Sequence, residues 1–124
     1  MIAAGIGCRS GCASDAIVVL VREAERQTGC RAATLAIPHF KSGEPGMAEA
    51  AMRLGARLVV VDAPALAAVQ ALCATHSNKV MQHTGLSSVA EAAALAAAGP
   101  GATLRLPRIA GAGATCAIAE GPGR

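Results

Sequence analysis

The segment 83–91 places a histidine, three hydroxyl groups, a glycine and a carboxylate at the expected start of a helix. Ser88 and Glu91 have the spacing of a capping box, in which each side chain bonds a backbone N–H of the first turn. The free N–H groups and the positive end of the helix dipole could also bind an anion. A helix cap alone and a cap that is also an anion site therefore both stay open. The candidates in this segment are His83 as a general base and, for ligand binding, Thr84, Gly85, Ser87, Ser88 and Glu91.

Three cations, Arg9, Lys41 and Arg108, are expected in loops or at strand ends. An Arg side chain presents a planar fork that matches a carboxylate, and a Lys side chain presents a point charge. If the three converge, they form a site for a ligand with several carboxylates, and otherwise they are solvated surface charges. The sequence leaves both interpretations open.

The hydrophobic pattern predicts strands and helices in alternation, followed by two closing strands. Ser14 or Asp15, Asp62 and Ser88 are the expected helix caps, and Gly29 and Gly55 are the expected stops. The predicted strands are 2–8, 33–37, 57–61, 103–107 and 115–120, with a small-residue loop at 109–114. The predicted helices are 14–28, 45–54, 63–73 and 88–98, and 76–82 is ambiguous.

Alternation of this kind predicts an α/β fold with a largely parallel sheet between two helical layers. The short connection between the last two strands makes that pair antiparallel. We therefore expect one domain over 1–124, a three-layer α/β/α sandwich around a mostly parallel sheet of about five strands. Sites in such sheets form beyond the carboxyl ends of the strands, which places 7–10, 38–44 and Asp62 on one rim. The helix start at Ser88 joins them if its helix runs in the same sense as the others.

The composition excludes several classes of protein. The chain is 53% hydrophobic with one aromatic residue, Phe40, so it has no Trp or Tyr on which a base could stack. The net charge of +3 is scattered rather than arranged in a basic stripe, so we expect no nucleic-acid partner. No apolar run reaches membrane-spanning length, so no membrane contact is expected either. Five cysteines without a secretion signal predict reduced thiols and a cytoplasmic protein.

The first strand raises two further possibilities. Gly5 and Gly7 resemble part of a dinucleotide fingerprint, but the third glycine is not at the required position, so they are expected to allow close approach of backbone. Cys8 and Cys12 lack the second pair that zinc patterns need, so neither a metal nor a cofactor is predicted. The Cys8 thiol is either an ordinary free or buried thiol, or a reactive one whose pKa is lowered by a helix N-terminus.

Four stretches in this order resemble one family: 5–9 (Gly-Ile-Gly-Cys-Arg), 41–46 (Lys-Ser-Gly-Glu-Pro-Gly), 84–95 and 114–119. Together they are similar to the CobE family of cobalamin biosynthesis and to the C-terminal domain of the CbiG family, over nearly the whole chain. The resemblance implies a three-layer α/β/α fold and a role in building the corrin ring of vitamin B12, within tetrapyrrole metabolism. The family often has Gly where this chain has Ser87, and Lys where it has Arg108. The ligand-binding candidates on the rim and in these motifs are Gly7, Cys8, Arg9, Lys41, Glu44, Thr84, Gly85, Ser87, Ser88, Glu91 and Arg108.

CbiG-like proteins open a lactone on the macrocycle and release a two-carbon fragment as acetaldehyde, whereas CobE-like proteins are the stand-alone form. This chain has no room for the other domains of a CbiG-like protein, so we expect a non-catalytic protein that binds or passes a corrin-ring (precorrin) intermediate. Other cobalamin-pathway enzymes are the further partners that this role implies. The alternative is a hydrolase of the cobalt-precorrin 5A type, with Glu44 or His83 as the base that activates water. A nucleotide or phosphate binder is a third reading, and it depends on the glycines and the helix N-terminus alone.

Overall fold

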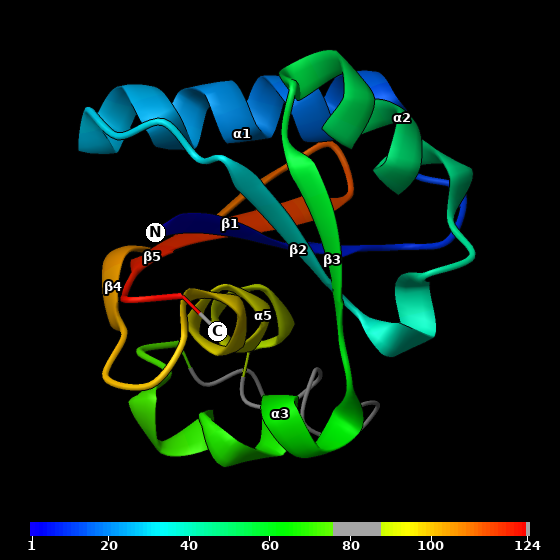
Figure 1. The fold of residues 1–124 in the computed structure, drawn as a ribbon. Helices are drawn as coiled ribbons and strands as arrows, with labels where there is room; N and C mark the ends of the chain where they lie inside the picture. Colours follow the sequence, from blue (N-terminus) through cyan, green and yellow to red (C-terminus); the bar gives the residue numbers. More distant parts are fainter. Residues whose placement is uncertain (76–87, 124) are drawn as a thin grey trace.

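A five-stranded sheet organises the computed structural model, which describes residues 1–75 and 88–123 (Figure 1). The order across the sheet is β3-β2-β1-β5-β4, so the first strand of the chain lies at its centre. The strands are β1 (Ile2–Cys8), β2 (Thr34–Pro38), β3 (Arg57–Val61), β4 (Thr103–Gly111) and β5 (Ala114–Glu120). The helices are α1 (Ser14–Thr28), α2 (Pro45–Leu54), α3 (Ala63–Ala68) and α5 (Val89–Ala98), with 3-10 turns η1 (His39–Lys41) and η2 (Gln70–Leu72).

The sheet is mixed, and the expectation of a mostly parallel sheet was wrong. β1, β2 and β3 pair in parallel, but β5 pairs antiparallel with both β1 and β4. The reason is the position of the closing hairpin. The chain enters it through β4 at the edge of the sheet and returns through β5 into the place beside β1, so the reversed strand has two neighbours instead of one.

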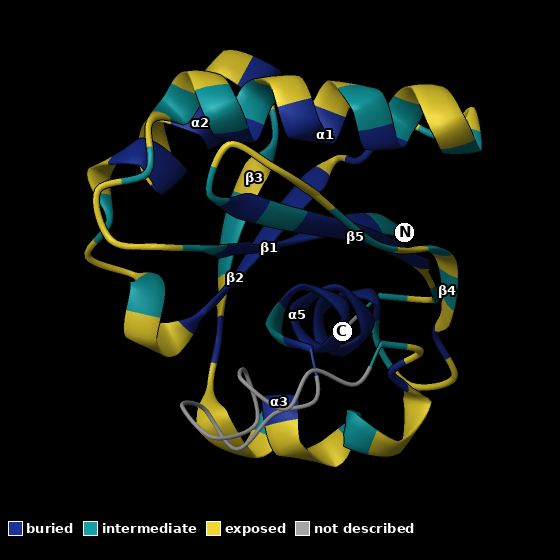
Figure 2. Cartoon of the chain, turned by 180° about the vertical axis from the view of Figure 1, so that it is seen from behind, coloured by how far each residue is buried: buried dark blue, intermediate teal, exposed yellow. Residues whose placement is uncertain are grey.

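Helices lie on both faces of the sheet. α1 and α2 cover one face, and α5 lies across the other, against β1 and β5 (Figure 1). α3 packs against α5 on the side away from the sheet, so this half of the molecule is deeper than the single helical layer that we expected (Figure 2). No helix among the described residues combines the length and the apolar character that a membrane span requires.

The two faces have separate cores. The α1–α2 face contains large aliphatic side chains, among them Ile17, Leu35 and Met47. The α5 face is built mainly from alanine, and Ala90 to Ala98 are all buried (Figure 2). A Cβ added at Gly5 would lie 2.0 Å from the Ala90 carbonyl oxygen, which confirms that this glycine permits close approach of backbone.

Several boundaries differ from the predicted ones. Ala13, not Ser14 or Asp15, occupies the N-cap of α1 without a side-chain bond, and Asp15 instead pairs with Arg53 of α2. α3 ends at Ala68 and continues only as the short turn η2. β4 extends to Gly111, because the hairpin turn needs only residues 112 and 113, where both φ angles are positive.

The Asp62 cap is confirmed, since its Oδ1 accepts the Ala65 N–H at 3.0 Å. The ambiguous segment 76–82 lies outside the described residues.

Candidate functional site

The carboxyl ends of β1, β2 and β3 and the N-terminus of α5 meet at one edge of the fold, which we call the rim. The three strands end at Cys8, Pro38 and Val61. A Cβ at Gly7, near the end of β1, would lie 3.7 Å from the side chain of Val89, the first residue of α5. α5 therefore runs antiparallel to β1, and its N-terminus lies at the rim. This orientation is the condition under which the helix start at Ser88 was expected to join the site.

Two loops at the rim are held together by Glu44. Both carboxylate oxygens of Glu44 accept the Gly11 N–H, at 3.2 and 3.1 Å, and thus join the β2–α2 loop to the β1–α1 turn. The turn is itself closed by the Cys12 N–H, which donates to the Arg9 carbonyl at 3.2 Å. Gly46 allows α2 to begin against this turn, since a Cβ there would lie 2.4 Å from the Cys12 carbonyl oxygen. Glu44, a candidate base, therefore fixes the relative position of the two loops.

Arg9 and Lys41 place positive charge on these loops. The Arg9 N–H donates to the Gly113 carbonyl at 3.1 Å, and its guanidinium lies over Gly113, where a Cβ would come within 2.4 Å of Nε. Lys41 is close enough for its charge to act on the Cys8 thiol. Neither cation forms an ion pair with a described carboxylate. Both charges are therefore available to a ligand.

Cys8 is not an activated nucleophile. Burial, followed by the neighbouring Cys12 and Glu44, raises the pKa of the Cys8 thiol to about 11, although Lys41 partly offsets them. Of the two interpretations left open for Cys8, the reactive thiol with a lowered pKa is therefore wrong. All five cysteines are free, and no three His, Cys, Asp or Glu side chains of the described chain cluster as a metal site would need.

A fully buried carboxylate lies behind the rim, in the first turn of α5. Glu91 is 0% exposed and accepts the Thr75 N–H at 2.8 Å, the Thr75 hydroxyl at 2.6 Å and the Arg108 N–H at 2.9 Å. Burial opposes the charge of this carboxylate, but the hydrogen bonds from Thr75 and Arg108 outweigh it and lower the pKa of Glu91. Glu91 thus binds three separate parts of the chain together: residue 75, α5 and β4.

Ser88 caps α5 as predicted. Its Oγ accepts the Glu91 N–H at 3.4 Å, and the residue is fully buried. Ser88 therefore shapes the helix N-terminus from inside the fold. Thr75 and Arg108, which lie far from Glu91 in the sequence, are among the donors to its carboxylate, so Glu91 joins distant parts of the chain and is not only a capping-box partner of Ser88.

The remaining candidates are spread more widely. Arg108 lies inside the edge strand β4, not in a loop, and it is the backbone N–H of Arg108 that reaches Glu91. Gly7 contacts Thr115, whose hydroxyl donates to the Gly7 carbonyl at 3.4 Å. The candidates His83, Thr84, Gly85 and Ser87 lie outside the described residues.

Sequence reasoning missed two residues of this region. Phe40 is 45% exposed on η1 beside Lys41, and its ring meets His39 edge to face with centroids 5.3 Å apart. A lone aromatic residue directly before a loop cation was a signal that could have identified it. Thr75 gave no such signal, because its partner Glu91 is sixteen residues away.

Comparisons with known proteins agree with one another. The family described as cobalamin synthesis G C-terminus matches residues 2–119. Protein CobE of a Sinorhizobium species is 31% identical over 118 residues, which are 93% of this chain and 77% of that protein. The solved structure of cobalamin biosynthesis protein chiG from Agrobacterium tumefaciens str. C58 is 46% identical, with 98% and 99% of the two chains covered and a TM-score of 0.80. A solved structure of CobE, from the cobalamin (vitamin B12) biosynthetic pathway, is 30% identical over 100% of this chain and 92% of that chain, with a TM-score of 0.90.

Proposed function

Because this chain belongs to the cobalamin synthesis G C-terminus family, we propose that it binds a corrin-ring intermediate of cobalamin biosynthesis at the rim without changing it chemically. One observation carries the proposal. Arg9 and Lys41 lie on two loops that Glu44 joins, beside the N-terminus of α5, and neither forms an ion pair with a described carboxylate.

The chemistry of the ligand fits this arrangement. A corrin precursor carries acetate and propionate side chains around a flat, apolar ring. Its carboxylates suit the Arg9 fork and the Lys41 ammonium, and the positive end of the α5 dipole adds to the same field. The exposed ring of Phe40 offers an apolar contact to the face of the macrocycle.

The buried residues would act through position. Ser88 and Glu91 are fully buried among neighbouring protein atoms, so they would set where the first turn of α5 points and would not touch the ligand. Arg108 contributes its backbone N–H to Glu91 in the same way. Gly7 and Cys8 would keep the end of β1 close to α5. From the sequence, the proposed site also retains His83, Thr84, Gly85 and Ser87.

The setting of this function is part of the proposal. Free cysteines suit the reducing cytoplasm, where we place the chain as a single domain over 1–124. A protein that holds an intermediate without reacting must receive it from one enzyme and release it to another, so other enzymes of the pathway are its proposed partners. Neither a nucleic acid nor a membrane is part of this scheme.

Titration with hydrogenobyrinic acid, a cobalt-free corrin polycarboxylate, tests the proposal. We expect a saturable change in the corrin absorbance and co-elution of corrin and protein on gel filtration. The methyl ester of the same corrin is the matched control, because it keeps the ring but removes the carboxylate charges, and it should bind far more weakly. No spectral change together with no co-elution would refute the proposed function.

A second ligand, which carries the lactone, distinguishes binding from hydrolysis. Incubation with a lactone-bearing precorrin should leave the lactone intact and release no acetaldehyde. Glu44 accepts the Gly11 N–H with both oxygens, which supports a bracing role rather than the activation of water. Acetaldehyde release would replace the binding proposal by a hydrolase of the cobalt-precorrin 5A type.

A further inference from the structure

The two edge strands of the sheet are protected very differently. β4 carries Pro107, which has no N–H to donate, and its pairing with β5 shifts register twice, between Leu104 and Leu106 and between Leu106 and Ile109. It also bears the charged side chains of Arg105 and Arg108. Proline, irregular register and charge are the usual means by which an edge strand is kept from pairing with another chain.

β3 lacks the proline and the register shifts, and its single charged residue, Arg57, stands at its first position. It reads Arg57-Leu58-Val59-Val60-Val61 and pairs with β2 residue for residue without a shift. Val60 is 50% exposed, which is high for a valine inside a strand. In Figure 1, β3 is the strand nearest to the viewer, and none of the labelled elements crosses in front of its middle. An open, regular, β-branched edge of this kind is a template for a further strand.

The backbone groups that face outward can be derived from one hydrogen bond. The Arg57 N–H donates to the Ala33 carbonyl at 2.9 Å, toward β2. Successive residues of a strand point their N–H and C=O groups to alternate sides, so Val59 and Val61 also face β2. The N–H and C=O groups of Leu58 and Val60 therefore point away from the sheet, where no described strand pairs with them.

We infer that β3 pairs antiparallel with β3 of a second copy of this chain, across a two-fold axis at Val59. In this register Leu58 of one copy lies opposite Val60 of the other, and the Val59 residues of the two copies lie opposite each other. The four outward N–H groups of the two copies then donate to the four outward C=O groups, which is the hydrogen-bonded pairing of an antiparallel ladder. The two sheets become one continuous sheet.

The edge is complementary to itself, which favours a second copy over an unrelated strand. The centre of the contact is apolar on both sides, since Leu58, Val59 and Val60 meet only one another. Arg57 is the first residue of β3, and Asp62 directly follows its last residue. In this register Arg57 of each copy lies opposite Val61 of the other, one residue before its Asp62, so one positive and one negative residue lie at each end of the apolar centre. A closed two-fold contact also ends the assembly at a dimer.

Sedimentation of the full chain over a range of concentrations tests the inference. The wild-type protein should shift from the mass of one chain toward twice that mass as the concentration rises. Val60→Pro removes an outward N–H that β2 does not use, and it should weaken dimerisation at least about tenfold. Val60→Thr keeps both the N–H and the β-branched shape, and its dimer dissociation constant should stay within about threefold of wild type.

Amide hydrogen exchange of the wild-type protein tests the same contact and needs no variant that must fold. The Leu58 and Val60 amides should exchange more slowly as the concentration rises, whereas the Val59 amide, which faces β2, should be protected at every concentration. A mass of one chain at all concentrations would overturn the inference. A dimer that survives Val60→Pro, with Leu58 and Val60 amides that exchange freely, would overturn it equally.

Discussion

The two faces of the sheet are packed by different means. On the α1–α2 face, the distance between helix and strand is set by large side chains such as Ile17, Leu20 and Met47. On the α5 face, backbone meets backbone, because Gly5 brings β1 against the first turns of an alanine helix. Side chains can repack around a change in volume, but a backbone contact cannot. The face that carries the helix N-terminus of the proposed site is thus also the face with the least room for adjustment.

The largest effect is expected at Gly5. The Cβ of Gly5→Ala would lie 2.0 Å from the Ala90 carbonyl oxygen and 2.5 Å from the Ala94 nitrogen, so α5 must move away from β1. Overpacking of a core costs about 1–3 kcal/mol and more when backbone must move, so we expect a loss of at least about 3 kcal/mol or no folded protein. Urea unfolding followed by circular dichroism measures it.

Two controls sharpen this prediction. Gly43→Ala adds the same methyl group in a loop where nothing lies within 4 Å, and it should change the free energy of unfolding by less than about 0.5 kcal/mol. Met47→Leu changes the shape of a buried side chain on the α1–α2 face and should cost less than about 1.5 kcal/mol. If Gly5→Ala is no more costly than Met47→Leu, the contrast between the two faces is wrong.

Glu91→Gln is expected to have the next largest effect. In the wild type, three donors bond the Glu91 carboxylate, and in the variant they meet a neutral amide group. The free energy of unfolding should therefore fall by about 2–3 kcal/mol near neutral pH. The folded state lowers the pKa of Glu91, so its contribution is complete above the unfolded value of about 4.3 and is lost as the pH falls through the lower folded value. The difference between wild type and Glu91→Gln should therefore shrink below about pH 4.

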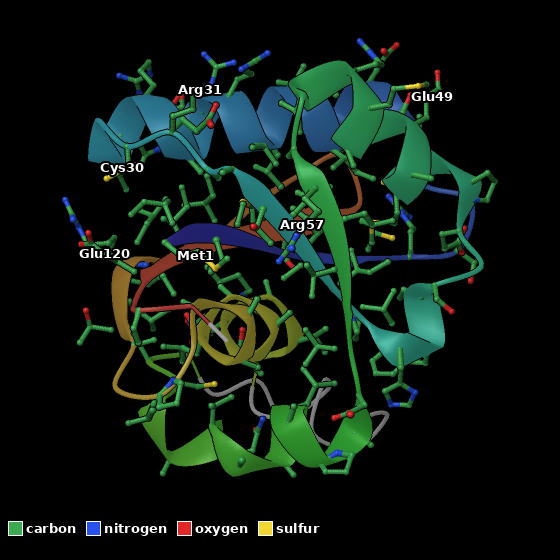
Figure 3. All side chains as sticks on the ribbon, in the orientation of Figure 1. Met1, Cys30, Arg31, Glu49, Arg57 and Glu120 are labelled. Atoms are coloured by element: carbon green, nitrogen blue, oxygen red, sulfur yellow. The ribbon has the colours of Figure 1, made fainter. Side chains whose placement is uncertain are left out.

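The matched control for Glu91 is Glu49→Gln on the exposed side of α2 (Figure 3). It should leave the free energy of unfolding within about 0.5 kcal/mol of wild type, because a surface substitution breaks no buried contact. Equal losses for the two variants, or a loss at Glu91 that does not depend on pH, would contradict the role assigned to the buried carboxylate.

Ser88→Ala separates support from binding. Loss of the cap should cost about 1 kcal/mol, the usual amount for such a hydroxyl. We also expect corrin binding to weaken at temperatures where the variant is still fully folded, because the first turn of α5 is part of the proposed site. Calorimetric titration after a thermal melt measures both quantities. Binding that falls only in step with the folded fraction would leave Ser88 as a cap alone.

Local signals in the sequence predicted much of the fold. The caps at Asp62 and Ser88, Pro45 at the start of α2 and the αL glycine Gly55 at its end all lie within one turn of the helix that they delimit. The apolar run at β3 is equally local. These elements could be predicted because the residues that determine them are neighbours in the chain.

Long-range pairings could not be predicted in the same way. The place of β5 between β1 and β4 depends on which edge the hairpin enters, and no single turn encodes that choice. The bonds from Thr75 and Arg108 to Glu91 join residues sixteen and seventeen positions apart, and two of the three donors are backbone groups that every residue type possesses. For the site, the sequence identified the cations Arg9 and Lys41, but the role of Glu44 in joining their loops required the structure.

The most direct test of the account is the affinity of Arg9→Ala for hydrogenobyrinic acid, measured beside Arg31→Ala. Both arginines are outside the described ion pairs, but Arg31 follows α1 at the end of the molecule away from the rim (Figure 3). Loss of one hydrogen-bonded charge costs about 1.5–3 kcal/mol, so Arg9→Ala should bind roughly ten- to a hundredfold more weakly with an unchanged free energy of unfolding. Arg31→Ala should bind as wild type does. Equal affinities of the two folded variants would contradict the assignment of the rim as the corrin site.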